Sequence, residues 1–240
     1  TGGMSDRGQG AEGLRGSPFE GFEVFVTEFT ALNNSGVDGH ALLFLDTRKQ
    51  TLTVHIEAEG LEPGQVHAQH IHGFPDDRDA KSPTIAQDDD GDGFVELAEG
   101  LETYGPIQLN LTLNPEDSAH DHGTPGHDHT GSAMFPTADA NGRLRYTETF
   151  RFDSSDPNAQ AIFNDIIPLE AKEIVLHGLT LRAGQGGDAP GVMDEADGTA
   201  GYKGVLPVAS GELEEISAPR QVLNMLRRGD FERADDWLFG

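Results

Sequence analysis

The sequence predicts an all-β fold, an antiparallel β-sandwich or barrel with long loops and a C-terminal helix. Two observations lead to this prediction. Short runs rich in β-branched and aromatic residues recur along the chain, and turn-forming residues such as the Asn-Gly pair at 141–142 separate them. Strands are expected at 22–29, 40–46, 51–58, 105–113, 144–152, 173–181 and 204–213.

The run over 51–58 predicts a strand with one buried face. Its apolar members alternate with polar ones, and successive side chains of a strand point to opposite faces of the sheet. We therefore expect the polar side chains to face solvent. The apolar set is Leu52, Val54, Ile56 and Ala58, and the polar set is Thr51, Thr53, His55 and Glu57.

Helix signals appear at two places. Asp156 followed by Pro157 is typical of a helix start, and apolar residues then recur on one face up to Ile167. A second helical segment, over 218–239, carries apolar residues that must pack on the sandwich or on a partner. We divide the chain into a flexible tail (1–17), a β-sandwich (18–216) with an insertion at 76–104, and a C-terminal helical extension (217–240).

Composition restricts the function classes. The 240 residues include 42 Asp and Glu against 16 Lys and Arg, and the formal net charge of −26 repels nucleic acids and anionic membranes. No apolar run approaches the roughly 20 residues that span a bilayer. The absence of cysteine excludes disulfides and thiolate metal ligands. Any bound metal must therefore be held by histidine, carboxylate or backbone oxygen.

An acidic loop, DDDGDGFVELAE at 88–99, predicts a calcium site. It matches the calcium loop of EF-hands position by position, including the glycine at the sixth position that allows a sharp turn. The proline that precedes it argues against a long entering helix, and a single loop suggests a structural clamp rather than a sensor. The predicted ligands are Asp88, Asp90, Asp92, the carbonyl of Phe94, Glu96 and the bidentate Glu99.

Histidines gather in the stretch HAQHIHGF at 67–74. Residues two apart on a strand share a face, so His70 and His72 are placed to bind one ion, whereas His67 is expected to be an ordinary hydrogen-bonding histidine. Another histidine, His177, lies in the apolar run over 173–181. Imidazole ligands suit copper and zinc. A Gly- and Pro-rich stretch, either a ligand loop or a solvated His/Asp segment, carries His120, His122, His127 and His129.

Four segments resemble the copper/zinc superoxide dismutases: GLEPGQVHAQHIHGFPD, TADANGRL, IVLH and GTAGYKG. The resemblance implies the Greek-key β-sandwich of that family and copper held by His70, His72 and His177. It implies that Lys203, in place of the family's arginine, guides superoxide. It also implies that one of His120 and His122 bridges copper and zinc and that zinc binds His127 and His129.

A second resemblance competes with the first. The stretches AQHIHGF, YGPIQLNLT and ASGEL resemble the chordin-type (CHRD) domain, which is not an established enzyme class and in which the histidines have a structural role. The two resemblances share a β-sandwich, so they agree on the fold and differ on the function.

Three functions remain open from the sequence. The first is a redox metalloprotein that binds copper, or zinc, and dismutates superoxide. The second is a non-catalytic, calcium-stabilised extracellular protein whose C-terminal helix binds another copy or a protein partner. The third is copper storage or delivery without turnover. In each case we expect an extracellular or periplasmic location in the mature form, metal ions as partners, and neither nucleic acid nor a membrane span.

Overall fold

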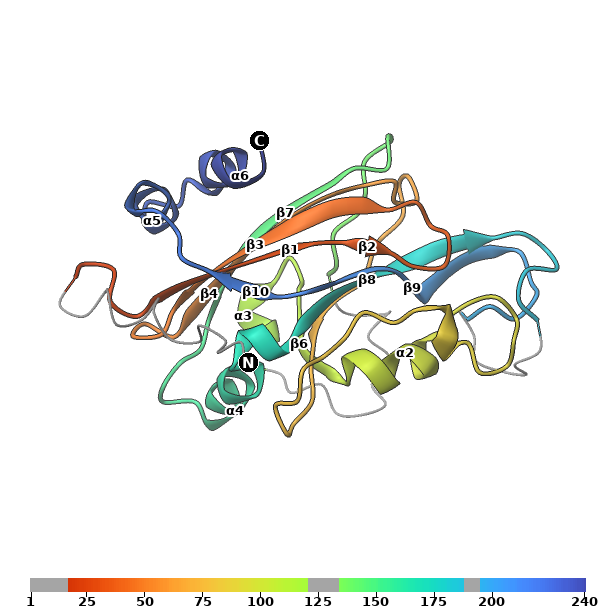
Figure 1. Cartoon of the computed structure of the whole chain (residues 1–240), viewed down its shortest axis with the longest axis horizontal. Helices are drawn as coiled ribbons and strands as arrows, with labels where there is room; N and C mark the ends of the chain where they lie inside the picture. Colours follow the sequence, from red (N-terminus) through yellow and green to blue (C-terminus); the bar gives the residue numbers. More distant parts are fainter. Residues whose placement is uncertain (1–16, 121–133, 188–194) are drawn as a thin grey trace, which may run out of the picture.

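Two antiparallel sheets form the body of the protein (Figure 1). The computed structural model describes residues 17–120, 134–187 and 195–240. One five-stranded sheet has the order β10-β1-β3-β4-β7, and the other has the order β2-β9-β8-β5-β6. All neighbouring strands in both sheets pair antiparallel. The predicted all-β sandwich is confirmed.

Most strands follow the expected runs, whereas the short strands at 30–31 and 214–216 were not expected. The first sheet consists of β1 (Phe22–Glu28), β3 (Asp38–Asp46), β4 (Thr51–Glu59), β7 (Leu144–Arg151) and β10 (Glu214–Ile216). The second consists of β2 (Thr30–Ala31), β5 (Gln69–His72), β6 (Ile107–Asn110), β8 (Glu173–Leu181) and β9 (Gly201–Glu212). Short helices connect or cover them: η1 (Ile85–Gln87), α2 (Leu97–Tyr104), α3 (Pro115–Ser118), α4 (Pro157–Ile166), η2 (Leu169–Ala171), α5 (Arg220–Arg227) and α6 (Phe231–Phe239).

The main apolar core lies between the two sheets. Leu43 and Ile56 from the first sheet belong to the same buried cluster as Ile71 and Leu176 from the second. The helix α4 adds its apolar face to this cluster. The expected cap of α4 is present, because the Asp156 side chain accepts a hydrogen bond from the backbone N–H of Asn158.

The outer face of the first sheet is covered by the C-terminal helices α5 and α6 (Figure 1). Leu42 and Phe44 of β3 pack there against apolar residues of both helices. The expectation that the polar face of β4 meets solvent is therefore wrong for Thr53 and His55, which are 7% and 0% exposed. The closing helical segment is broken in two near Gly229, whose φ of 78° is a helix-ending conformation that suits glycine.

The C-terminal helices are expected to contribute to stability through this buried cluster. Leu223→Ala removes a buried side chain of α5 and is expected to lower the free energy of unfolding by about 2–4 kcal/mol. Trp237→Ala removes a half-exposed side chain of α6 and is expected to cost about 1 kcal/mol or less. Urea unfolding of the two variants measures the difference, and equal costs would contradict the packing described here.

Among the residues that the structure describes, no helix is both long enough and apolar enough to cross a membrane.

Candidate metal centre

Three histidines meet on the outer face of the second sheet. The strands β5 and β8 pair antiparallel with His70 opposite Val175, so His177, two residues further along β8, lies on the same face as His70 and His72. One ring nitrogen from each histidine lies within 4.8 Å of the other two. The ring centroids are 5.4 Å apart for His70 and His72, and 5.0 Å apart for His70 and His177. The structure thus brings together the three residues that the resemblance implied as copper ligands.

Backbone carbonyls orient two of these rings. The Nδ1–H of His72 donates to the carbonyl of Gly105 at 2.8 Å, and the Nδ1–H of His177 donates to the carbonyl of Val205 at 2.7 Å. Because a carbonyl only accepts, Nδ1 carries the proton and Nε2 of each neutral ring keeps its lone pair. Neither Nε2 atom has a hydrogen-bond partner within the described part of the chain. Metal-ligating histidines are typically held in this way, through the nitrogen that does not bind the metal.

Burial keeps two of these imidazoles, those of His72 and His177, in the neutral form that binds metal. His70, His72 and His177 are 4%, 0% and 1% exposed. Burial, together with the nearby His177, lowers the pKa of His72 to about 3. Burial lowers the pKa of His177 to about 4. Both rings are therefore neutral near pH 7, with the Nε2 lone pair available to a metal ion.

The titration of these rings gives a testable expectation. In the metal-free protein, His72 and His177 should stay neutral down to about pH 5, whereas His40, whose pKa is raised by its hydrogen bond to Asp235, should gain its proton first. The folded pKa values of the two buried rings lie below the unfolded value near 6.5. Their contribution to stability is therefore complete above about pH 6.5 and is lost as the pH falls toward 4. A histidine NMR titration measures this, and an ordinary pKa for both buried rings would contradict it.

Aromatic side chains pack against two of the three histidines. Tyr104, at the end of α2, packs edge-on against His72 with ring centroids 4.6 Å apart. Phe135 packs against His70 at 5.2 Å. The residue after α2 is Gly105, whose carbonyl holds His72. The helix α2 therefore both covers the cluster and orients one of its rings.

A buried carboxyl group lies beside the cluster. Glu173 is the cross-strand partner of His72 on β8 and accepts a hydrogen bond from the Ser82 hydroxyl at 2.6 Å. Burial raises the pKa of Glu173 to about 7. The group is therefore able to hold or release a proton near neutral pH.

The acidic loop at 88–99 leads directly into α2. Carboxylate oxygens of Asp88, Asp90 and Glu99 lie within 4.8 Å of one another. The two carboxylate oxygens of Asp88 accept hydrogen bonds from the backbone N–H groups of residues 91, 92 and 93 and so shape the turn. Gly93, at the sixth position, has a φ of 92°. Before the loop there is only the short turn η1, as the preceding proline indicated.

The other predicted ligands of the loop are partly buried. Burial raises the pKa of Asp92, and the neighbouring carboxylates of Asp90 and Asp88 raise it further. The Oδ2 atom of Asp92 has no hydrogen-bond partner in the described residues. Burial also raises the pKa of Glu96, whose side chain accepts from the backbone N–H of Ala196 at 2.8 Å. This concentration of negative charge is the environment that a divalent cation compensates.

Comparison with known proteins gives one match to a family model, over part of the chain. Residues 26–129 match the CHRD domain. The matching segment contains His70, His72 and the acidic loop, whereas His177 lies outside it.

Among solved structures, the chain is similar to a SOD-like protein from Bacillus subtilis, with 15% identity over 78% of this chain and 96% of that chain and a TM-score of 0.36. A proline-to-histidine mutant of a SOD-like protein from Bacillus subtilis gives 14% identity over 78% and 95% of the two chains, with a TM-score of 0.36. No curated protein matches the chain.

The remaining predicted residues lie elsewhere. In the CHRD-matching segment, His120 pairs through Nδ1 with Asp156 at the start of α4 and does not belong to the group of three histidines. His122, His127 and His129 lie outside the described residues. Lys203 is buried, and its ammonium group lies 2.6 Å from an Asp197 oxygen, which holds the pKa of Asp197 well below its usual range. Its role as an anion guide stays a prediction.

Sequence reasoning missed the groups that orient and cover the histidines. The carbonyls of Gly105 and Val205 are backbone atoms, which no side-chain motif reveals. No motif in the sequence distinguishes Tyr104 and Phe135 from ordinary core residues. His67 agrees with its expectation, since its Nδ1 bonds to the carbonyl of His177 at 2.8 Å.

Proposed function

We propose that this protein binds one copper or zinc ion through His70, His72 and His177. The observation that carries the proposal is the pair of buried Nε2 atoms of His72 and His177, which have no hydrogen-bond partner among the described residues. Such atoms are rare in folded proteins, because each forfeits the hydrogen bond it made in water. Three imidazoles on one sheet face form a ligand set that suits copper or zinc.

The groups around the three histidines each contribute to metal binding. The carbonyls of Gly105 and Val205 hold the tautomers, and Tyr104 and Phe135 exclude water from the rings. When bound, the ion supplies Lewis acidity and, if it is copper, one-electron redox chemistry.

We propose further that the loop at 88–99 binds calcium. This ion stabilises the helix α2, which packs against the histidine cluster through Tyr104. The converging oxygens of Asp88, Asp90 and Glu99 support the calcium site. The covalent continuity from Glu99 through α2 to Tyr104 and Gly105 supports the coupling. A structural calcium site and a strongly acidic surface fit an extracellular or periplasmic location, where we place the protein.

The burial of the cluster favours retention of the metal over turnover. Superoxide dismutation needs the anion to reach the ion, whereas the three histidines are at most 4% exposed. The cation predicted to guide superoxide, Lys203, is already paired with Asp197. We therefore propose metal storage, delivery or a structural metal as the function, rather than dismutation.

Elemental analysis of the natively purified protein, followed by copper titration and a superoxide dismutase assay, tests the proposal. We expect one copper or zinc ion per chain at the histidines, calcium in addition, and no dismutation beyond that of free copper. Calcium without any transition metal, even after reconstitution, would overturn the histidine site. Turnover by the copper-loaded protein would overturn the storage or structural role while leaving the site intact.

A further inference from the structure

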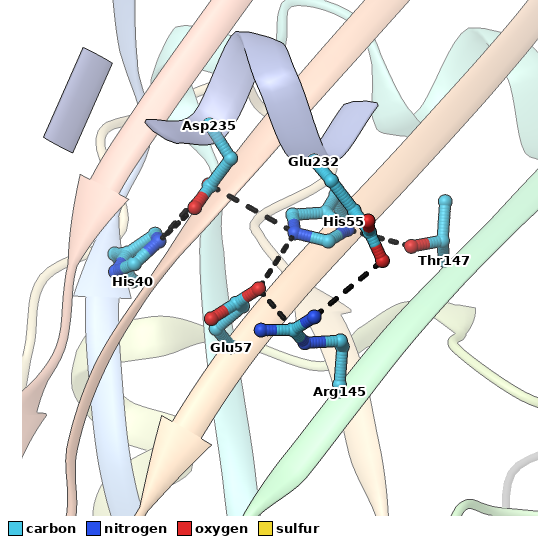
Figure 2. Close-up of polar contacts among 7 residues, drawn as sticks. All are labelled: His40, His55, Glu57, Arg145, Thr147, Glu232 and Asp235. Atoms are coloured by element: carbon cyan, nitrogen blue, oxygen red, sulfur yellow. Dashed lines mark hydrogen bonds and ion pairs between the residues drawn. The ribbon is translucent and has the colours of Figure 1, made fainter. Parts of the chain in front are cut away.

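A second group of metal-ligating side chains lies on the outer face of the first sheet, beneath α6 (Figure 2). His55 and Glu57 project from β4, and Asp235 projects from α6. One nitrogen or carboxylate oxygen from each lies within 4.8 Å of the other two. The Nε2 atom of His55 is 3.5 Å from Glu57 Oε1 and 3.9 Å from Asp235 Oδ1.

The imidazole of His55 is the central observation. It is fully buried, its Nδ1 lies 2.6 Å from the Thr147 hydroxyl, and its Nε2 has no hydrogen-bond partner in the described part of the chain. Figure 2 shows this Nε2 facing the carboxylates of Glu57 and Asp235. When Nδ1–H donates to Thr147, the Nε2 lone pair points at two anionic groups. That arrangement is repulsive, and either a cation between them or a proton on Nε2 relieves the repulsion.

Neighbouring groups hold the two carboxylates in place. The Nε2 of His40 lies 2.9 Å from both oxygens of Asp235, and Arg145 Nε lies 3.0 Å from Glu57 Oε1. Arg145 also contacts Glu232 of α6 at 3.4 Å. Partners of this kind typically surround metal ligands and fix their orientation. Three carboxylates, those of Glu57, Glu232 and Asp235, against one guanidinium leave the group with a net negative charge.

A cavity adjoins this group at Glu57, and carboxylates outnumber the two arginines in its lining. The cavity has a volume of about 930 Å³, and His40, Glu57 and Arg145 form part of its lining. Four more carboxylates line it: Glu28, Asp38, Glu59 and Asp139. An excess of carboxylates of this kind concentrates cations next to Glu57.

We propose that His55, Glu57 and Asp235 bind a divalent transition-metal ion, zinc or one of similar chemistry, which fastens the C-terminal helix α6 to the sandwich. One imidazole and two carboxylates are a ligand set that zinc uses. Tetrahedral zinc separates neighbouring ligand atoms by about 3.3 Å, so groups that lie within 4.8 Å of one another need to close by at most about 1.5 Å. This site is independent of the histidine cluster on the opposite sheet, and neither proposal depends on the other.

Zinc binding to the full-length, metal-depleted protein tests the proposal, with Zn²⁺ alone as the probe in equilibrium dialysis. All other sites are common to the wild type and the variants, so the difference isolates this one. Asp235→Asn and Glu57→Gln are each expected to bind one zinc ion fewer, or to bind it at least about 100-fold more weakly. Glu232→Gln is the matched control, because Glu232 lies on the same helix and contacts the same arginine but is not a ligand. It is expected to bind zinc as the wild type does.

Hydrogen exchange is the second measurement. It distinguishes an ion that bridges α6 and the sheet from a mere change of surface charge in the variants. Zinc is expected to slow amide hydrogen exchange over 231–239 in the wild type and in Glu232→Gln, but not in Asp235→Asn. Unchanged zinc stoichiometry and affinity in both ligand variants would overturn the proposal. So would an equal loss in all three variants, because this would show only an adventitious ion on an acidic surface. If Asp235→Asn does not fold, Glu57→Gln decides, since the Glu57 side chain is 29% exposed and its replacement leaves the helix packing intact.

Discussion

Replacing both His70 and His72 by alanine is expected to abolish binding of copper or zinc at the cluster. Affinity should fall by at least about 100-fold, or about 2.7 kcal/mol, because two of the three imidazoles are lost. The sandwich is expected to stay folded, because neither ring belongs to the apolar core between the sheets. Isothermal titration with copper measures the affinity, and circular dichroism checks the fold.

His67→Gln is the matched control for this variant. His67 is also buried and lies three residues from His70, but its Nδ1 bonds to the carbonyl of His177 and it is not a member of the cluster. It is expected to keep copper affinity within about tenfold of the wild type, the size of an indirect effect. Full affinity in the double alanine variant would contradict the site.

Removing calcium is expected to loosen residues 76–104 and to speed the loss of copper from the histidines. Glu99→Gln should have the same effect, because Glu99 is the predicted bidentate ligand. Its oxygens also accept from the N–H of Asp89 in the loop and from the N–H of Glu96, which caps α2. We expect calcium affinity to fall by roughly 100-fold and copper release to become about tenfold faster or more. Hydrogen exchange along α2 and stopped-flow copper transfer to a chelator measure the two effects.

Glu102→Gln is the control for the calcium variant. Glu102 lies on α2 but is exposed and is not among the converging oxygens, so calcium affinity and copper release should match the wild type. If removal of calcium by a chelator unfolds the whole sandwich, this would contradict the view that calcium stabilises only residues 76–104. Unchanged exchange in α2 after chelation would contradict the coupling between the two sites.

Local patterns of the sequence predicted most of the strands, the helix α4 and part of the site. Alternation predicted β4 and β7, the Asp156 cap predicted the start of α4, and the two-residue spacing placed His70 and His72 on one face. These features depend on neighbours within a few residues, so they are visible in a short window.

Features that depend on long-range packing were not visible in the sequence. His177 entered through a family resemblance, because the register between β5 and β8 is not encoded in either strand alone. The burial of His55 depends on Asp235 and the helix that carries it, 180 residues away. A polar residue on a strand reads as exposed until a distant element is known to cover it.

The most direct test of the histidine metal site is anomalous diffraction from crystals of the protein loaded with copper, recorded at the copper absorption edge. We predict a peak bonded to Nε2 of His72 and of His177 and to a ring nitrogen of His70, at about 2.0–2.1 Å from each. A fully loaded crystal without a peak between these three rings, or with peaks only at other histidines, would contradict the site.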